Sequence, residues 1–271
     1  MTIRFIAMDL DDTLLTPELT ISAENRRAIL AAAGHGVKVA IATGRMYQSA
    51  KKFAEQFDFD MICLCYNGAL IKTSRSGKVL DFNPLKLPAA KRIMTRFMEN
   101  DLTMNVYFND QLYQREPTPE GLHYAKMSKV QPVYVGKDLR EFLTEAPHKV
   151  LGMGDPGKLD KIQPILEKEF AGEVFLTRSK PGYLEALNWG LSKGWALQRL
   201  TAKMGISADE VMTIGDAPND LEMLEWAGVG VAVANAHPDA LQAADWVAPD
   251  YRENGVAAAI ERFVLREGAA S

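Results

Sequence analysis

The chain has 271 residues and a mass of 30.0 kDa, enough for one large domain or two ordinary ones. Apolar residues make up 47% and charged residues 24%, which is typical of a globular protein and argues against a disordered chain. The formal net charge is −4, from 31 Lys and Arg against 35 Asp and Glu, so the basic excess typical of nucleic-acid-binding proteins is missing.

Short apolar runs alternate with segments of helical period in the first part of the chain, which is the pattern of βαβ units and a parallel sheet. The expected elements are strands over residues 3–8, 37–42 and 62–65, helices over 23–33 and 46–57, and a hairpin over 69–72 and 78–82. Cys63 and Cys65 fall in the third strand and would point to the same face. A disulfide between them would be strained and two thiols are too few for a typical structural zinc site, so we expect core cysteines.

The alternation of strands and helices weakens after residue 83 and returns near residue 188. The later elements are helices over 193–204, 221–226 and 256–264, and strands over 211–214, 229–233 and 245–248. We therefore predict an α/β fold with two domains: a parallel-sheet core from residues 1–83 and 188–271, and an inserted α/β domain over 84–187. No apolar run reaches the roughly 18 residues that span a bilayer, and no signal peptide is recognisable, so a cytoplasmic location is expected.

Four polar clusters lie at the ends of predicted core elements, where open α/β sheets place their ligand sites. They are Asp9-Leu10-Asp11-Asp12-Thr13, Thr43-Gly44-Arg45, Ser192-Lys193-Gly194 and Gly215-Asp216-Ala217-Pro218-Asn219-Asp220. Two unit charges about 4 Å apart repel by about 4 kcal/mol at an effective dielectric constant of about 20, so three carboxylates in the first cluster suggest a counterion. Mg²⁺ prefers such oxygen ligands. The structural alternative is an Asp-rich loop that caps the next element, and the second carboxylate pair, Asp216 and Asp220, makes that alternative weaker.

The other two clusters could bind an anion. Thr43 and Gly44 would offer a hydroxyl, backbone N–H groups and a helix N-terminus, although strand–Thr–Gly–helix turns are also common without a ligand. Lys193 stands at a predicted helix start, where its charge opposes the helix dipole. A bound phosphate would reverse that unfavourable effect, and a solvated surface lysine is the alternative.

Taken together, Asp-x-Asp-x-Thr, Thr-Gly, a later Lys and Gly-Asp-x-x-x-Asp resemble, in order and spacing, the motifs of the haloacid dehalogenase superfamily. Only about 30 residues separate Asp11 from Thr43, and the large insert lies between Thr43 and Lys193. This placement resembles the Cof-type (class IIB) members with a C2-type α/β cap. The resemblance implies a Rossmann-like core, a cap that sets substrate specificity, and Mg²⁺-dependent hydrolysis of small phosphate monoesters, such as sugar phosphates, through an aspartyl-phosphate.

The resemblance also implies roles for individual residues. Asp9 would be the nucleophile and a Mg²⁺ ligand, and Asp11 would be the general acid/base and lend its backbone carbonyl to the metal. The implied phosphate-binding residues are Thr43, Gly44, Lys193 and Asn219; Asp216 would complete the metal ligands and Asp220 would support them. Further substrate contacts are expected among Arg45, Asn67, Arg178, Lys180, Tyr183, Glu185 and Asn188. The expected partner is a small phosphorylated metabolite, not nucleic acid or a membrane; the physiological substrate and the oligomeric state stay open.

Asp12 stands where this family usually has Gly. Asp tolerates left-handed backbone better than most residues, and we expect its side chain to turn away from the phosphate and cap a neighbouring backbone group. Two other functions stay open: a phosphomutase using the same intermediate, which the short gap between the first two motifs disfavours, and a phosphometabolite-binding regulator without turnover. All of these depend on the Asp9 and Asp216 oxygens meeting within about 5 Å around a shared cation.

Overall fold

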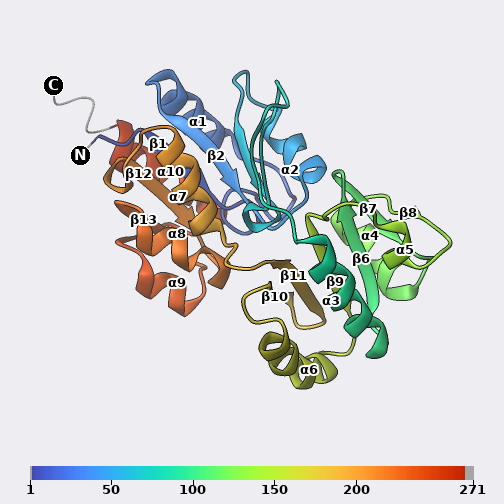
Figure 1. The fold of residues 1–271 in the computed structure, drawn as a ribbon. Helices are drawn as coiled ribbons and strands as arrows, with labels where there is room; N and C mark the ends of the chain where they lie inside the picture. Colours follow the sequence, from blue (N-terminus) through green and yellow to red (C-terminus); the bar gives the residue numbers. More distant parts are fainter. Residues whose placement is uncertain (1, 266–271) are drawn as a thin grey trace. The chain divides into compact units, whose positions relative to one another are not determined.

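The computed structural model describes residues 2–265 and divides into two compact units (Figure 1). The core unit combines the chain up to residue 81 with the chain from residue 192 onward, and the inserted unit comprises residues 82–191. The boundaries expected from the sequence, after residues 83 and 187, differ from these by a few residues.

The core unit is built on an eight-stranded sheet in the order β14-β13-β12-β1-β2-β3-β4-β5. Its strands are β1 (Phe5–Met8), β2 (Lys38–Ala42), β3 (Ile62–Cys65), β4 (Leu70–Thr73), β5 (Val79–Phe82), β12 (Val211–Gly215), β13 (Val229–Val233) and β14 (Trp246–Ala248). The strands from β14 to β3 pair in parallel, and β4 returns antiparallel to β3. All four residues of β1 are buried, as expected for a parallel strand covered on both faces. The predicted α/β fold with a parallel-sheet core is confirmed.

Helices cover this sheet in two groups. They are α1 (Ala23–Gly34), α2 (Tyr47–Ala54), α7 (Lys193–Lys203), α8 (Leu221–Trp226), α9 (Pro238–Ala243) and α10 (Gly255–Ile260). Helices α7 and α8 pack in one apolar cluster with β1, β2 and β3, while α1 packs against α10. The short helical turns are η1 (Tyr66–Gly68), η2 (Ala208–Glu210), η3 (Pro218–Asp220), η4 (Tyr251–Glu253) and η5 (Glu261–Leu265). In the described part of the chain, no helix has both the length and the apolar character needed to cross a membrane.

The expected core cysteines are confirmed, since Cys63 and Cys65 are free and buried in β3. Ser22 caps α1 by accepting a hydrogen bond from the backbone N–H of Asn25. Helix α2 is shorter than the predicted 46–57. The N–H groups of Gln56 and Phe57 bond to carbonyls three residues back, which tightens the chain into turns and ends the helix.

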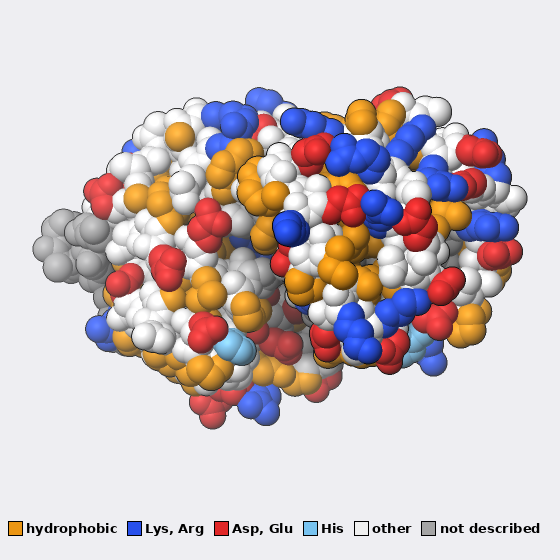
Figure 2. Space-filling view, turned by 60° about the horizontal axis from the view of Figure 1, so that its bottom comes forward, with side chains coloured by type: hydrophobic (Ala, Val, Ile, Leu, Met, Phe, Trp, Pro, Cys, Tyr) orange, Lys and Arg blue, Asp and Glu red, His pale blue; other side chains and the backbone are white. Residues whose placement is uncertain are grey.

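The inserted unit has a six-stranded sheet in the order β10-β11-β9-β6-β7-β8. Its elements are α3 (Leu87–Glu99), β6 (Thr103–Phe108), β7 (Gln111–Gln114), α4 (Pro119–Ser128), β8 (Val133–Tyr134), α5 (Leu139–Phe142), β9 (Lys149–Met153), α6 (Pro156–Glu169), β10 (Val174–Lys180) and β11 (Tyr183–Asn188). Residues of α3 and α6 form an apolar core with one face of this sheet. Basic and acidic side chains lie interspersed on the face of the molecule in Figure 2, in keeping with the nearly balanced charge of the chain.

Candidate active site

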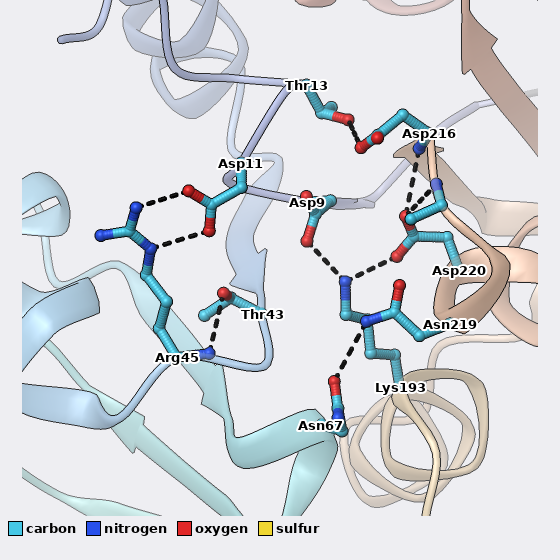
Figure 3. Close-up of polar contacts among 11 residues, drawn as sticks. Asp9, Asp11, Thr13, Thr43, Arg45, Asn67, Lys193, Asp216, Asn219 and Asp220 are labelled. Atoms are coloured by element: carbon cyan, nitrogen blue, oxygen red, sulfur yellow. Dashed lines mark hydrogen bonds and ion pairs between the residues drawn. The ribbon is translucent and has the colours of Figure 1, made fainter. Parts of the chain in front are cut away.

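The candidate residues meet at the carboxyl end of the core sheet. Asp9 directly follows β1, Thr43 follows β2, and Asp216 follows β12. Because β12, β1 and β2 are adjacent parallel strands, their ends lie at one edge of the sheet, although the residues are far apart in the sequence. Figure 3 shows Asp9 and Asp220 directed at the ammonium group of Lys193, with Thr43 and Asp216 on the adjoining loops.

Lys193 is the first residue of α7, and its side chain is only 1% exposed. Its Nζ donates to Asp9 Oδ1 at 2.5 Å and to Asp220 Oδ1 at 2.7 Å. The alternative of a solvated surface lysine is therefore wrong. Burial raises the pKa of Asp9 well above its ordinary value, although Lys193 works in the opposite direction. Burial also opposes the charge of Lys193, but the attraction of Asp220 and Asp9 outweighs it and raises the pKa of Lys193.

Asp220 is completely buried and uses both carboxylate oxygens. Oδ1 accepts from Lys193, and Oδ2 accepts from the backbone N–H groups of Asp216, at 3.1 Å, and Ala217, at 3.0 Å. Gly215 leaves room for this carboxylate, since a Cβ there would lie 2.7 Å from Asp220 side-chain atoms. Asp220 therefore holds both the lysine and the loop that carries Asp216.

Asp216 completes a group of three carboxylates. One oxygen each of Asp9, Asp216 and Asp220 lie within 4.8 Å of one another. Asp216 Oδ1 also accepts from the hydroxyl of Thr13 at 2.6 Å, a contact that the sequence did not indicate although Thr13 belongs to the first cluster. Burial raises the pKa of Asp216 to about 6.

The carboxylate oxygens of Asp9, Asp216 and Asp220 are suitable ligands for a hard divalent cation. One ammonium group lies among three carboxylates. Burial first, and then repulsion by neighbouring aspartates, disfavours the charged forms of Asp9 and Asp216, and a bound divalent cation would offset both effects. Oxygen ligands of this type are those that Mg²⁺ binds in proteins. Asp9 and Asp216 are the two members whose carboxylates are not already saturated by protein hydrogen bonds.

Asp11 lies beside this group but is bound elsewhere. Both of its oxygens accept from the Arg45 guanidinium, Oδ2 from Nε at 2.7 Å and Oδ1 from Nη2 at 2.5 Å. Arg45 also donates to Ser49 Oγ at 3.3 Å and lies over the ring of Phe53. In Figure 3 the Asp11 carboxylate accordingly points towards Arg45 and away from Lys193. The sequence proposed both residues but gave no sign that they pair.

Thr43 and Asn219 are linked through Asn67. Thr43 is buried, and its hydroxyl accepts from the backbone N–H of Arg45 at 3.1 Å. Asn67 donates its backbone N–H to the Thr43 carbonyl at 3.1 Å, and Asn67 Oδ1 accepts from Asn219 Nδ2 at 3.2 Å. The structure thus brings together all the core residues that the sequence proposed.

Asp12 has the left-handed backbone that its position suggested, with φ of 57°. The expected cap is wrong: within residues 2–265, no group donates a hydrogen bond to its exposed carboxylate. Its backbone carbonyl is held instead, by Asn235 Nδ2 at 2.9 Å, and Asn235 Oδ1 accepts from the Tyr251 N–H at 3.1 Å. Asn235 follows β13 in Ala-Asn-Ala, a context with no signal for this role.

The remaining candidates lie in strands β10 and β11 of the inserted unit. The Arg178 guanidinium donates to Gln163, to Asp160 and to the carbonyl of Pro181. Tyr183 packs beside Tyr124 and under the ammonium of Lys180, while Asn188 ends β11, half-buried. Glu185 is buried in an ion pair with Lys149 at 2.9 Å. Contact of any of these residues with a substrate stays a prediction.

Comparison with known proteins agrees with the site. The sequence profile of haloacid dehalogenase-like hydrolases matches residues 6–260. The phosphatase YcsE of Bacillus subtilis, named for 5-amino-6-(5-phospho-D-ribitylamino)uracil, is 32% identical over 265 residues, covering 97% of this chain and 96% of YcsE. The crystal structure of a haloacid dehalogenase-like hydrolase from Bacteroides thetaiotaomicron, 29% identical, superposes with a TM-score of 0.88 over 96% of this chain and 99% of that one. The subclass IIB sugar phosphatase BT4131 shares the fold, with a TM-score of 0.79 at 20% identity, over 96% of this chain and 98% of that one. The resemblance drawn from the motifs is confirmed: the chain is an enzyme of the haloacid dehalogenase-like hydrolase family.

Proposed function

We propose that this protein is a Mg²⁺-dependent phosphatase that hydrolyses small phosphate monoesters through an aspartyl-phosphate on Asp9. The observation that carries this is the buried contact of Asp9 with Lys193, with an oxygen of Asp216 within 4.8 Å of one of Asp9. YcsE is named for a phosphorylated ribityl compound, and BT4131 is named as a sugar phosphatase. The substrates in these two names share the phosphate group and differ in the leaving group. Sugar phosphates and related metabolites are therefore the first substrates to test.

Asp9 is suited to attack phosphorus because its position and charge are controlled by its neighbours. A carboxylate that approaches a phosphate dianion is repelled, so positive charge must be gathered at the site. The Lys193 ammonium, 2.5 Å from Asp9 Oδ1, supplies one such positive charge, and its side chain is buried from solvent. Asp9 and Asp216, with the backbone carbonyl of Asp11, would hold Mg²⁺, which neutralises charge on the phosphoryl group when bound. The covalent intermediate divides one difficult hydrolysis into two displacements.

Asp11 would protonate the leaving-group oxygen and later activate water. Both of its oxygens accept from Arg45 in the structure, so this proton transfer requires the pair with Arg45 to open. Thr43, Gly44 and Asn219 would bind the phosphoryl oxygens, and Asp220 would keep Lys193 and the Asp216 loop in place. The inserted unit, predicted as residues 84–187, would act as the cap that selects the leaving group, with Arg178, Tyr183 and Asn188 as candidate contacts.

Phosphate release measures this function directly. Purified protein incubated with sugar phosphates, nucleotides and cofactor phosphates should release inorganic phosphate from at least one class when Mg²⁺ is present. EDTA should abolish the release, and excess Mg²⁺ should restore it. Formation of an isomerised sugar phosphate would identify a phosphomutase instead. Tight binding of a phosphometabolite without release, in Mg²⁺, would contradict an enzyme of either kind and identify a regulator.

The Thr13 hydroxyl offers a second test, because it orients one oxygen of Asp216. Thr13→Val keeps the volume and removes the hydrogen bond, and groups that orient a metal ligand typically change metal affinity by about 10–100-fold. The Mg²⁺ concentration that gives half-maximal activity should therefore rise about tenfold or more, with a matching loss in calorimetric Mg²⁺ affinity. Thr13→Ser keeps the hydroxyl and should stay close to the wild type. An unchanged Mg²⁺ affinity in Thr13→Val would refute this role.

A further inference from the structure

The turn that follows β3 has an unusual backbone. Tyr66, Asn67 and Gly68 have φ angles of 52°, 53° and 104°, so three consecutive residues are left-handed. Glycine adopts this conformation easily, Asn tolerates it, and a bulky residue such as Tyr disfavours it. Backbone of this kind persists only where the surroundings enforce it, and it concentrates at functional sites.

Hydrogen bonds to the neighbouring loop fix the turn. The Tyr66 N–H donates to the Arg45 carbonyl at 3.0 Å, and the Asn67 N–H donates to the Thr43 carbonyl at 3.1 Å. Both ends of the Thr43-Gly44-Arg45 segment are therefore attached to this turn. The strained conformation is therefore tied to the loop that is predicted to bind phosphate.

The side chain of Asn67 fills the space between two predicted phosphate-binding groups. It is 7% exposed, and its Oδ1 accepts from Asn219 Nδ2 at 3.2 Å. On the other side it lies against Gly44, where an added Cβ would be 3.2 Å from the same Oδ1. Figure 3 shows Asn67 directed at Asn219, beside the Lys193 side chain. Asn219 itself is exposed, and without Asn67 its carboxamide would keep the rotational freedom of a surface side chain.

We propose that Asn67 is a positioning residue that sets the orientation of Asn219 and its distance from the Thr43-Gly44 turn. The left-handed turn is what directs the Asn67 carboxamide into this gap. This inference rests on the proposed function, because it assumes that Thr43, Gly44 and Asn219 bind one phosphoryl group. It assigns to Asn67 no contact with the substrate; its effect passes through Asn219 and the turn.

Asn67→Gly separates the side chain from the backbone. Glycine adopts the left-handed conformation without strain, so the midpoint of thermal unfolding should stay the same or rise, while the carboxamide is lost. An Asn219 carboxamide that is no longer oriented would lose its hydrogen bond to the charged phosphoryl group. A hydrogen bond of this kind corresponds to about a tenfold change or more in affinity. For an aryl phosphate, kcat/KM should therefore fall about tenfold or more, and the inhibition constant for inorganic phosphate should rise by a similar factor. Asn254→Gly, at another left-handed Asn with φ of 65° beside α10, is the matched control and should change neither.

Coupling to Asn219 provides the decisive measurement. Asn219→Ala should lower kcat/KM, as Asn67→Gly does. The double variant should have a kcat/KM no lower than that of the less active single variant, because both changes remove the same interaction. Unchanged phosphate inhibition and kcat/KM in Asn67→Gly, or multiplied losses in the double variant, would overturn the inference. If the wild type releases no phosphate, the proposed function fails. Calorimetric binding of inorganic phosphate to the wild type and to Asn67→Gly, with Mg²⁺, then still tests Asn67.

Discussion

Replacing Asp9 by Asn is expected to lower the rate of phosphate release by a factor on the order of 10⁴ or more, because loss of a covalent nucleophile removes the intermediate altogether. The amide has nearly the same shape as the carboxylate but does not attack phosphorus. Background hydrolysis in the remaining site is the only activity that should survive. The measurement is kcat for an aryl phosphate in saturating Mg²⁺, compared with the wild type in the same preparation.

The same variant should remain folded, and this makes the result interpretable. Burial raises the pKa of Asp9, which means that the folded protein disfavours the charged form and accepts a neutral side chain there. The amide oxygen of Asn can still accept from Lys193, which donates to Asp9 in the wild type. Lys193 also keeps Asp220 as a charged partner, so no buried charge is left alone. The midpoint of thermal unfolding should therefore stay near or above that of the wild type.

Asp60→Asn is the control for the loss of an aspartate. Asp60 lies between α2 and β3 and accepts from the backbone N–H groups of Arg75 and Ser76 in the turn between β4 and β5, so the change affects a structural cap. Its kcat should equal that of the wild type. An Asp9→Asn variant that keeps a tenth or more of the wild-type kcat would rule out Asp9 as the nucleophile.

The core could be predicted because its sequence pattern has one dominant cause. Buried parallel strands such as β1, β3 and β13 need apolar residues on both faces, so they are recognisable as short continuous apolar runs. The positions of Asp9 and Asp216 could be predicted from these strands, because the residues that directly follow parallel strands lie at the same edge of the sheet. That β12 lies directly beside β1 depends on the order of strands, which a single sequence does not contain.

Side-chain partners in the site were harder to predict than its members. The sequence proposed Asp11 and Arg45 separately, yet their two-fold hydrogen bond depends on how β1 and β2 are aligned. The contacts of Thr13 with Asp216 and of Asn235 with Asp12 join residues about 200 positions apart. No local pattern encodes such pairs.

The inserted unit was predictable only in outline, because charged residues in its strands do not mark an exposed face. Lys149 in β9 and Glu185 in β11 are almost completely buried, and each is neutralised by the other across antiparallel strands. Sequence patterning treats Lys and Glu as solvent-facing residues. The buried ion pair of Lys149 and Glu185 is an exception to this rule. Either residue alone would be too unfavourable to bury, and only their pairing in the folded structure makes burial possible.

Lys193→Met is expected to reduce both activity and stability, for one electrostatic reason. Lys193 is the cation between the buried carboxylates of Asp9 and Asp220, and removing one partner of a buried ion pair typically costs about 3–5 kcal/mol of folding free energy. The phosphoryl group also loses a fixed positive charge, and loss of one such stabilising group lowers kcat by about 10²–10³-fold. Urea unfolding and kcat, measured on the same samples, give the two effects separately.

The double variant Lys193→Met with Asp220→Asn separates them further. Asn in place of Asp220 removes one of the two uncompensated charges and keeps an oxygen that can accept from the Asp216 and Ala217 N–H groups. Stability should therefore recover in large part, because a neutral buried group needs no counterion. Activity should not recover, since neither new side chain carries positive charge. Lys203→Met removes a half-exposed lysine at the other end of α7 from its ion pair with Asp81 of β5, and Asp81 keeps Arg199 as a second cationic partner. This change should alter the unfolding free energy by at most about 1 kcal/mol and leave kcat unchanged. Wild-type stability in Lys193→Met would show that Lys193 does not compensate the buried carboxylates of the folded protein. Recovery of activity in the double variant would show that the reaction does not need the positive charge of Lys193.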